Sequence, residues 1–166
     1  MKTLYVIRHA KSSWAHPEQA DMDRGLNERG KRDAPRMGRK LKEKDVRPHL
    51  MLSSPARRAF STAKRIAVVL DYPKEKIKTD RLLYHADEET ILSVVQTISD
   101  KCDDVVIFGH NPGLTEFVNS IADKEVYIDN IPTCGIAAFK LPIESWKAAT
   151  WRCASLLFFE YPKKTQ

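Results

Sequence analysis

Two histidines and an arginine follow apolar runs that are typical of buried strands. Arg8 and His9 come directly after Thr3–Ile7, and His110 comes shortly after Val105–Phe108. Short runs of β-branched and aromatic residues favour strands. Because open α/β sheets bind their ligands beyond the carboxyl ends of the strands, we expect the three side chains to meet at one edge of a sheet.

These residue types suit the transfer of a phosphoryl group. An imidazole is largely neutral at pH 7, so His9 could attack phosphorus through a free ring nitrogen. A guanidinium presents a planar fork of donors that matches two phosphate oxygens, so Arg8 could hold the group. The tripeptide Arg8-His9-Ala10 is common, however, and a surface pair after a strand is the alternative interpretation. His110 could equally cap the next helix.

A third basic element opens the helix that is predicted to begin at Pro55. The amino terminus of a helix attracts anions through its unpaired N–H groups and the helix dipole. Arg57 and Arg58 lie in this first turn, where their charge opposes the dipole unless an anion or a carboxylate is near. We expect one of the two guanidinium groups to point to solvent and the other to be available for an anion.

Strands and helices alternate along the chain, which predicts an α/β fold with a mainly parallel sheet. Apolar periodicity, turn residues and N-caps such as Asn27 place the elements. The expected strands are residues 3–8, 49–53, 77–79, 104–109, 135–141 and 155–161, and the expected helices are residues 27–44, 55–70, 88–99 and one starting near Pro112. The last two strands could form a hairpin, which would give the sheet an antiparallel edge. The length predicts a single domain over residues 1–166.

Composition limits the classes of protein to which the chain can belong. No apolar run is long enough to cross a bilayer, and Met1-Lys2 leads straight into the first strand, so we expect a cytoplasmic location and no membrane partner. The three cysteines form no Cys-x-x-Cys pair, which argues against a disulfide scaffold or a zinc site.

The charge of the chain is unevenly distributed, with a net value of +6. Residues 1–81 hold 21 basic and 10 acidic side chains, and residues 82–166 hold 7 basic and 12 acidic side chains. A basic half can serve an anionic partner. Acidic residues interleave with the basic ones in the helix predicted over residues 27–44, however. We therefore interpret these charges as a solvated face and expect no nucleic-acid partner.

Four stretches of the chain together resemble the histidine phosphatase superfamily, and within it the SixA-type phosphohistidine phosphatases. They are Leu4–Trp14, Asp23–Gly30, Ser53–Ala59 with Thr62 and Ala63, and Gly109–Pro112, in the family's order. The resemblance implies the phosphoglycerate mutase-like fold, a three-layer α/β/α arrangement around a mainly parallel central sheet. The short chain leaves little room for the large lid of mutase-like members. We therefore expect an open pocket that could admit a phosphorylated side chain of another protein.

The resemblance also implies roles for individual residues. His9 matches the nucleophile that becomes a phosphohistidine, Arg8 the first phosphate clamp, and His110 the second histidine of the pocket. In the family the second clamp follows a serine by four positions. Counting from Ser54 gives Arg58, the second of the two adjacent arginines. No metal and no organic cofactor are expected.

The substrate contacts and the proton donor follow less directly from the resemblance. Ser13 and Arg24 lie in motif-bearing loops and are expected to contact the substrate. Mutase-like members carry a glutamate as general acid in the stretch that corresponds to residues 82–88, and here no carboxylate stands at the expected place. Asp87 or Glu88 would have to substitute, unless they cap the next helix. A SixA-type activity fits this absence, since an imidazole leaves more easily than an alkoxide.

Other phosphatase classes do not match the chain. None of the cysteines is followed six positions later by arginine, as cysteine-based phosphatases require, and the Asp21-Met22-Asp23 sequence lies in a polar loop rather than after a strand. Three hypotheses stand. The chain hydrolyses phosphohistidine in a protein, it hydrolyses a small phosphorylated molecule, or it is a non-enzymatic module that binds anions or nucleic acid.

Overall fold

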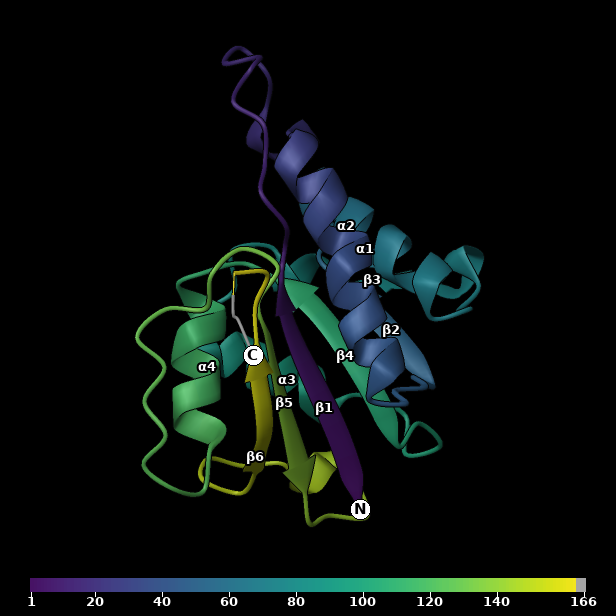
Figure 1. Ribbon diagram of the computed structural model, residues 1–166. Coiled ribbons are helices and arrows are strands. Elements are labelled where there is room, and N and C mark those ends of the chain that lie inside the picture. Colours follow the sequence, from purple (N-terminus) through teal and green to yellow (C-terminus); the bar gives the residue numbers. More distant parts are fainter. Residues whose placement is uncertain (164–166) are drawn as a thin grey trace.

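The computed structural model describes residues 1–163, in which a mixed β-sheet has helices on both of its faces (Figure 1). The strands are β1 (Lys2–Arg8), β2 (Leu50–Ser53), β3 (Lys78–Thr79), β4 (Asp104–Gly109), β5 (Ile136–Leu141) and β6 (Ser155–Glu160). The helices are α1 (Glu28–Glu43), α2 (Arg57–Val69), α3 (Glu88–Gln96) and α4 (Gly113–Ile121), with short 3-10 helices η1 (Asp21–Asp23), η2 (Lys74–Lys76), η3 (Arg81–Leu83) and η4 (Trp146–Ala148). The expected three-layer α/β/α architecture is confirmed.

The sheet has the strand order β3-β2-β4-β1-β5-β6. The first four strands in this order are parallel, whereas β5 pairs antiparallel with β1 and β6 pairs antiparallel with β5. The mainly parallel sheet and the antiparallel pairing of the last two strands are therefore as predicted. The strand that runs against the others is β5, one place in from the edge.

Apolar residues on both sides of β1 explain why this strand lies at the centre of the fold. Leu4 and Val6 belong to the apolar cluster that includes Phe117 of α4 and residues of α3. Tyr5 and Ile7 belong to the cluster that α1 and α2 complete on the opposite face. Parallel strands covered on both faces are expected to lack polar alternation. Within residues 1–163, none of the helices has the length and apolar character that crossing a membrane requires.

The register of the parallel strands brings their carboxyl ends together. Arg8 at the end of β1 lies beside Gly109 at the end of β4, and the last residue of β2 lies beside Phe108. His9 and His110 are the next residues in the chain, so both leave the sheet at the same edge. The loop between β1 and α1 extends beyond this edge (Figure 1), and its short helix η1 contacts α2.

The two helices that begin near this edge start differently. Asn27 caps α1, and its side chain accepts a hydrogen bond from a backbone N–H of the first turn, as predicted. The prediction that Pro55 lies in the first turn of the next helix is wrong, because α2 begins at Arg57 after the N-cap residue Ala56. The hydroxyl of Ser54 accepts the Ala56 N–H, which holds a turn ahead of the helix.

Gly113 allows α4 to begin against the loop that follows η3. A Cβ atom at this position would overlap the carbonyl oxygen of Ala86, which is backbone and cannot rotate away. We predict that Gly113→Ala lowers the free energy of unfolding in urea by about 1–3 kcal/mol, the usual cost of overpacking. The control is Gly109→Ala, whose Cβ would meet the side chain of Leu114 at 3.4 Å. An equal loss in both variants would contradict this account.

Candidate active site

A pocket of about 270 Å³ opens at the carboxyl edge of the parallel strands. Four residues that the sequence analysis expects to act together line it: Arg8, His9, Arg58 and His110. They come from the end of β1, the first turn of α2 and the turn before α4. The strand register therefore brings His9 and His110, which are 101 positions apart in the sequence, into one cavity.

The ring of His9 is oriented by its own backbone neighbour. Nδ1 lies 2.8 Å from the carbonyl oxygen of Ala10. Since a carbonyl can only accept, Nδ1 carries the proton of the neutral ring, and Nε2 keeps its lone pair. Burial lowers the pKa of His9 to about 4, and the guanidinium groups of Arg58 and Arg8 act in the same direction. The ring is thus neutral at pH 7 and presents a nucleophilic nitrogen.

His110 lies beside this ring, with the two ring centroids 5.2 Å apart. Its Nε2 is 2.8 Å from the hydroxyl oxygen of Ser54. When this hydroxyl donates to Nε2, the proton of the neutral ring sits on Nδ1. Burial, together with the nearby His9 and Arg58, lowers the pKa of His110 to about 3. Because Nδ1 has no hydrogen-bond partner among residues 1–163, it can serve an incoming ligand.

Three arginines bring buried N–H groups to the same pocket. Within the described part of the chain, the Nε atoms of Arg8, Arg24 and Arg58 are buried and have no hydrogen-bond partner. Leaving a buried donor unpaired costs about 1–3 kcal/mol. The three residues all line one cavity, where an anion would be a partner for their guanidinium groups. Each guanidinium has five N–H groups, so its existing bonds leave several free.

The carboxylate of Asp21 holds two of these arginines in place. Arg58 donates to the main-chain oxygen of Asp21 at 2.8 Å and to Oδ2 at 3.0 Å. Arg24 donates to Oδ1 at 3.1 Å, and the Tyr84 hydroxyl donates to Oδ2 at 2.6 Å. Although burial works to raise it, the pKa of Asp21 falls well below its usual range, because Tyr84, Arg58 and Arg24 all donate to the carboxylate.

Arg24 lines the pocket, whereas Ser13 does not. The guanidinium of Arg24 donates to the hydroxyl of Ser12 and lies 3.8 Å from the ring centroid of Trp14. Ser13 lines a neighbouring hollow, and its hydroxyl accepts the N–H of Ala15. The pocket lining therefore does not include Ser13, whose contact with the substrate stays a prediction. Ser12 forms an isolated β-bridge with Leu26, and adjacent side chains of an extended segment point to opposite sides.

The same neighbouring hollow holds Arg57, and this separates the two adjacent arginines of α2. Arg57 is exposed and lies against Gly25, while Arg58 is buried and lines the pocket. Arg57 therefore meets the expectation that one of the two guanidinium groups points to solvent. Of the two residues, Arg58 is the one whose position suits a phosphate clamp.

Asp87 and Glu88 lie outside the pocket. The side chain of Asp87 caps α3 by accepting the N–H of Thr90 at 2.8 Å, and Glu88 accepts the hydroxyl of Ser120 at 2.5 Å. Their hydrogen bonds agree with the alternative that these residues cap the helix, and a role as proton donor stays a prediction. Both carboxylates belong to the first turn of α3 or its cap, where they stabilise the helix start.

Sequence reasoning missed Asp21, Tyr84 and His85. In the sequence, Asp21 stands out only as part of an Asp-x-Asp sequence that is typical of another phosphatase class. His85 lies in the stretch where mutase-like members carry a carboxylate, so an imidazole in that stretch is the signal that could identify it. Its Nε2 is 3.1 Å from Oδ2 of Asp21, and its ring centroid is 5.2 Å from that of His110.

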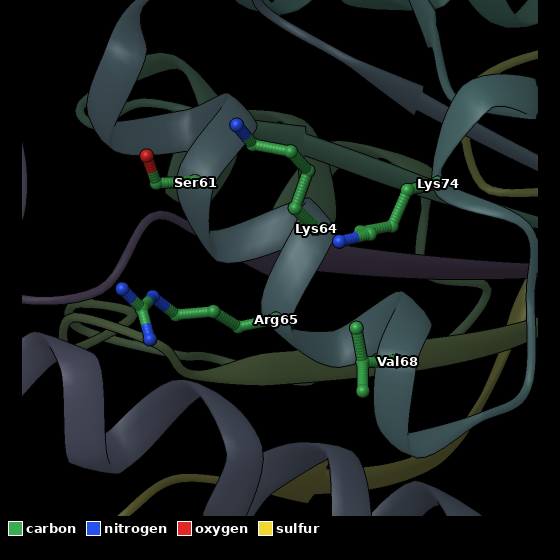
Figure 2. Close-up of a pocket in the computed structure, with 5 residues that line it drawn as sticks. All are labelled: Ser61, Lys64, Arg65, Val68 and Lys74. Atoms are coloured by element: carbon green, nitrogen blue, oxygen red, sulfur yellow. The ribbon is translucent and has the colours of Figure 1, made fainter.

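A second hollow, of about 300 Å³, lies on the outer side of α2 (Figure 2). It is lined by Ser61, Lys64, Arg65 and Val68 from the helix and by Lys74 of η2. This hollow is basic but holds no imidazole, and none of the buried unpaired donors described above belongs to it. It is therefore not the candidate site. Within residues 1–163, no group of three or more His, Cys, Asp or Glu is arranged to hold a metal ion.

Sequence comparison relates the chain to one family and to proteins that match all or part of it. Residues 4–83 match the model of the histidine phosphatase superfamily (branch 1). An uncharacterized protein of Mycobacterium leprae (strain TN) is 28% identical over 167 residues, which cover 95% of this chain and 100% of the relative. A 2,3-bisphosphoglycerate-dependent phosphoglycerate mutase of Bifidobacterium longum is 40% identical over 62 residues, or 36% of this chain and 25% of that enzyme.

Structural comparison extends the similarity over the whole fold. A SixA protein from Agrobacterium tumefaciens superimposes with a TM-score of 0.80 and 27% identity, covering 97% of this chain and 98% of the other. The protein histidine phosphatase SixA complexed with tungstate gives a TM-score of 0.82 at 18% identity, covering 96% and 97%. Residues 4–83 therefore match the histidine phosphatase superfamily, and the chain as a whole has the fold of SixA-type structures.

Proposed function

We propose that this protein is a phosphatase that transfers a phosphoryl group to Nε2 of His9 and then to water. The observation that carries the proposal is the state of His9: a neutral ring whose Nδ1 is held by the Ala10 carbonyl and whose Nε2 is available in a pocket with Arg8 and Arg58. A nucleophile and an anion clamp in one cavity are the two parts that phosphoryl transfer requires.

The geometry supports a reaction in two displacements. In the first, Nε2 of His9 attacks phosphorus, a bond from nitrogen to phosphorus forms, and the bond from phosphorus to the leaving group breaks. In the second, water attacks the phosphohistidine and releases phosphate. Negative charge spreads over the phosphoryl oxygens in each transition state. We infer that Arg8, Arg58 and His110, which line the cavity, stabilise this charge.

The substrate we propose is phosphohistidine in a protein. The rim of the pocket carries exposed side chains, with Trp14 71% and His85 53% exposed, so a leaving group larger than the cavity can extend into solvent. An imidazole leaving group also needs less acid assistance than an alkoxide. The SixA structure described as a protein histidine phosphatase supports the same choice through its shared fold.

A substrate panel tests this activity against hydrolysis of small molecules. We predict the highest kcat/KM on phosphohistidine peptides, compared with phosphoserine peptides, sugar phosphates and phosphoglycerates.

His9→Ala should lower turnover by at least about 10³-fold on every substrate, because the covalent intermediate cannot form. Circular dichroism of the variant checks that it folds. Faster hydrolysis of a small phosphate ester would replace the protein substrate, and an active His9→Ala variant would remove the nucleophile.

The two adjacent arginines of α2 provide a matched pair of variants. Arg58→Ala should reduce kcat by about 10²–10³-fold, the usual cost of removing one donor that stabilises the transition state. Arg57→Ala should leave kcat nearly unchanged, because its side chain lies outside the pocket. Steady-state kinetics on one substrate compare them, and equal losses would show that the clamp is misassigned.

The depressed pKa of His9 predicts the acid side of the pH profile. A lowered pKa means that the ring stays neutral, and Nε2 stays nucleophilic, until the pH falls towards about 4. We therefore expect no loss of kcat/KM, expressed per concentration of substrate dianion, between pH 7 and about pH 5, and a fall below about pH 5. A decline centred at the ordinary histidine value, about pH 6.5, would contradict the orientation and burial of the ring.

A further inference from the structure

His85 forms a carboxylate–imidazole pair with Asp21 at the mouth of the pocket. Its Nε2 lies 3.1 Å from Oδ2 of Asp21, and a carboxylate can only accept, so Nε2–H donates to it. The ring centroid of His85 is 5.2 Å from that of His110 and 4.1 Å from that of Tyr84. None of the roles given above to His9, His110 and the arginines uses this side chain.

The backbone places His85 here at a cost. Its φ of 53° lies in the left-handed region, which residues other than glycine rarely adopt and which recurs at functional sites. Two contacts hold the turn. The Tyr84 hydroxyl donates to the carboxylate that also binds His85, and the carbonyl of Ala86 lies against the bare Cα of Gly113. The backbone of His85 thus adopts a left-handed conformation, and its imidazole lines the pocket.

Burial separates the phosphoryl end of the pocket from the end that faces solvent. His9 and His110 are 8% and 4% exposed, and the unpaired nitrogen atoms that suit phosphoryl oxygens are buried with them. His85 is 53% exposed. A phosphoryl group bound at the buried end therefore directs its leaving group toward the rim, where His85 stands.

Two other titratable groups near His85, Asp21 and Tyr84, are poorly suited to deliver a proton to the leaving group. Asp21 is ionised at neutral pH, because its pKa lies well below the usual range. The hydroxyl proton of Tyr84 is committed to Asp21, and this hydrogen bond raises the pKa of the tyrosine. The imidazole of His85, in contrast, can pass a proton through Nδ1 while its Nε2–H stays bonded to Asp21.

We propose that His85 is the general acid of the reaction and that Asp21 positions it. This inference rests on the proposed function. In the first displacement the bond between phosphorus and the leaving atom breaks, that atom takes the proton from Nδ1 of the protonated His85, and Nε2 of His9 takes the phosphoryl group. In the second, neutral His85 accepts a proton from the attacking water. The bond from phosphorus to Nε2 of His9 breaks, and phosphate leaves.

Two aryl phosphates that differ in their leaving group test this role. Phenol has a pKa of about 10, as tyrosine does, and needs a proton as it departs. The p-nitrophenolate ion is stable near neutral pH and needs little help. The variant is His85→Asn, because asparagine tolerates the left-handed region but cannot carry a proton at neutral pH. The matched control is His16→Asn, since His16 is an exposed histidine beside a carboxylate that lies outside the pocket.

We expect His85→Asn to lower kcat/KM for phenyl phosphate by about 10²–10⁴-fold and for p-nitrophenyl phosphate by less than about fivefold. His16→Asn should match the wild type on both esters. Near-normal activity on p-nitrophenyl phosphate itself shows that the variant folds. Equal losses on the two esters, or no loss on either, would overturn the assignment. A wild-type protein that cleaves neither ester and forms no phosphohistidine on His9 would instead refute the proposed function.

Discussion

Buried guanidinium groups with unpaired N–H donors are the constraint on which the site depends. Arg8, Arg24 and Arg58 each bring a buried Nε without a partner in the described chain to the same cavity. Such an arrangement is unfavourable in the empty protein, because charge and donors are both withdrawn from water. The same groups keep His9 neutral, since burial and neighbouring positive charge disfavour its protonation. The buried guanidinium groups therefore both provide donors for an anion and keep His9 neutral.

Asp21 makes this concentration of positive charge tolerable. Its carboxylate and main-chain oxygen together accept from Arg58, and the carboxylate also accepts from Arg24 and Tyr84. The loop between β1 and α1 is thereby fixed to the start of α2, although the two are far apart along the chain. Asp21 therefore orients Arg24 and Arg58, whereas Arg8 donates to the main-chain oxygen of Ile131.

The fold and the buried half of the site follow from the sequence, whereas the rim does not. Apolar runs identify β1 and β4, and two strands that end at one edge bring His9 and His110 together. Contacts of Asp21 and His85 depend on loop conformations, including a left-handed residue, and no periodic pattern encodes these. The position of Ser13 outside the pocket could not be predicted for the same reason, because a motif within an irregular loop does not tell which side a residue faces.

The bonds between Asp21 and Arg58 also bear on how turnover ends. A phosphate ion that enters the cavity meets an arginine whose charge is already partly neutralised, and it has to share that arginine with a carboxylate. In the proposed reaction this sharing would lower the affinity for orthophosphate below the value that three unshared guanidinium groups would give. Release of the product would then be easier, and inhibition by accumulated phosphate weaker.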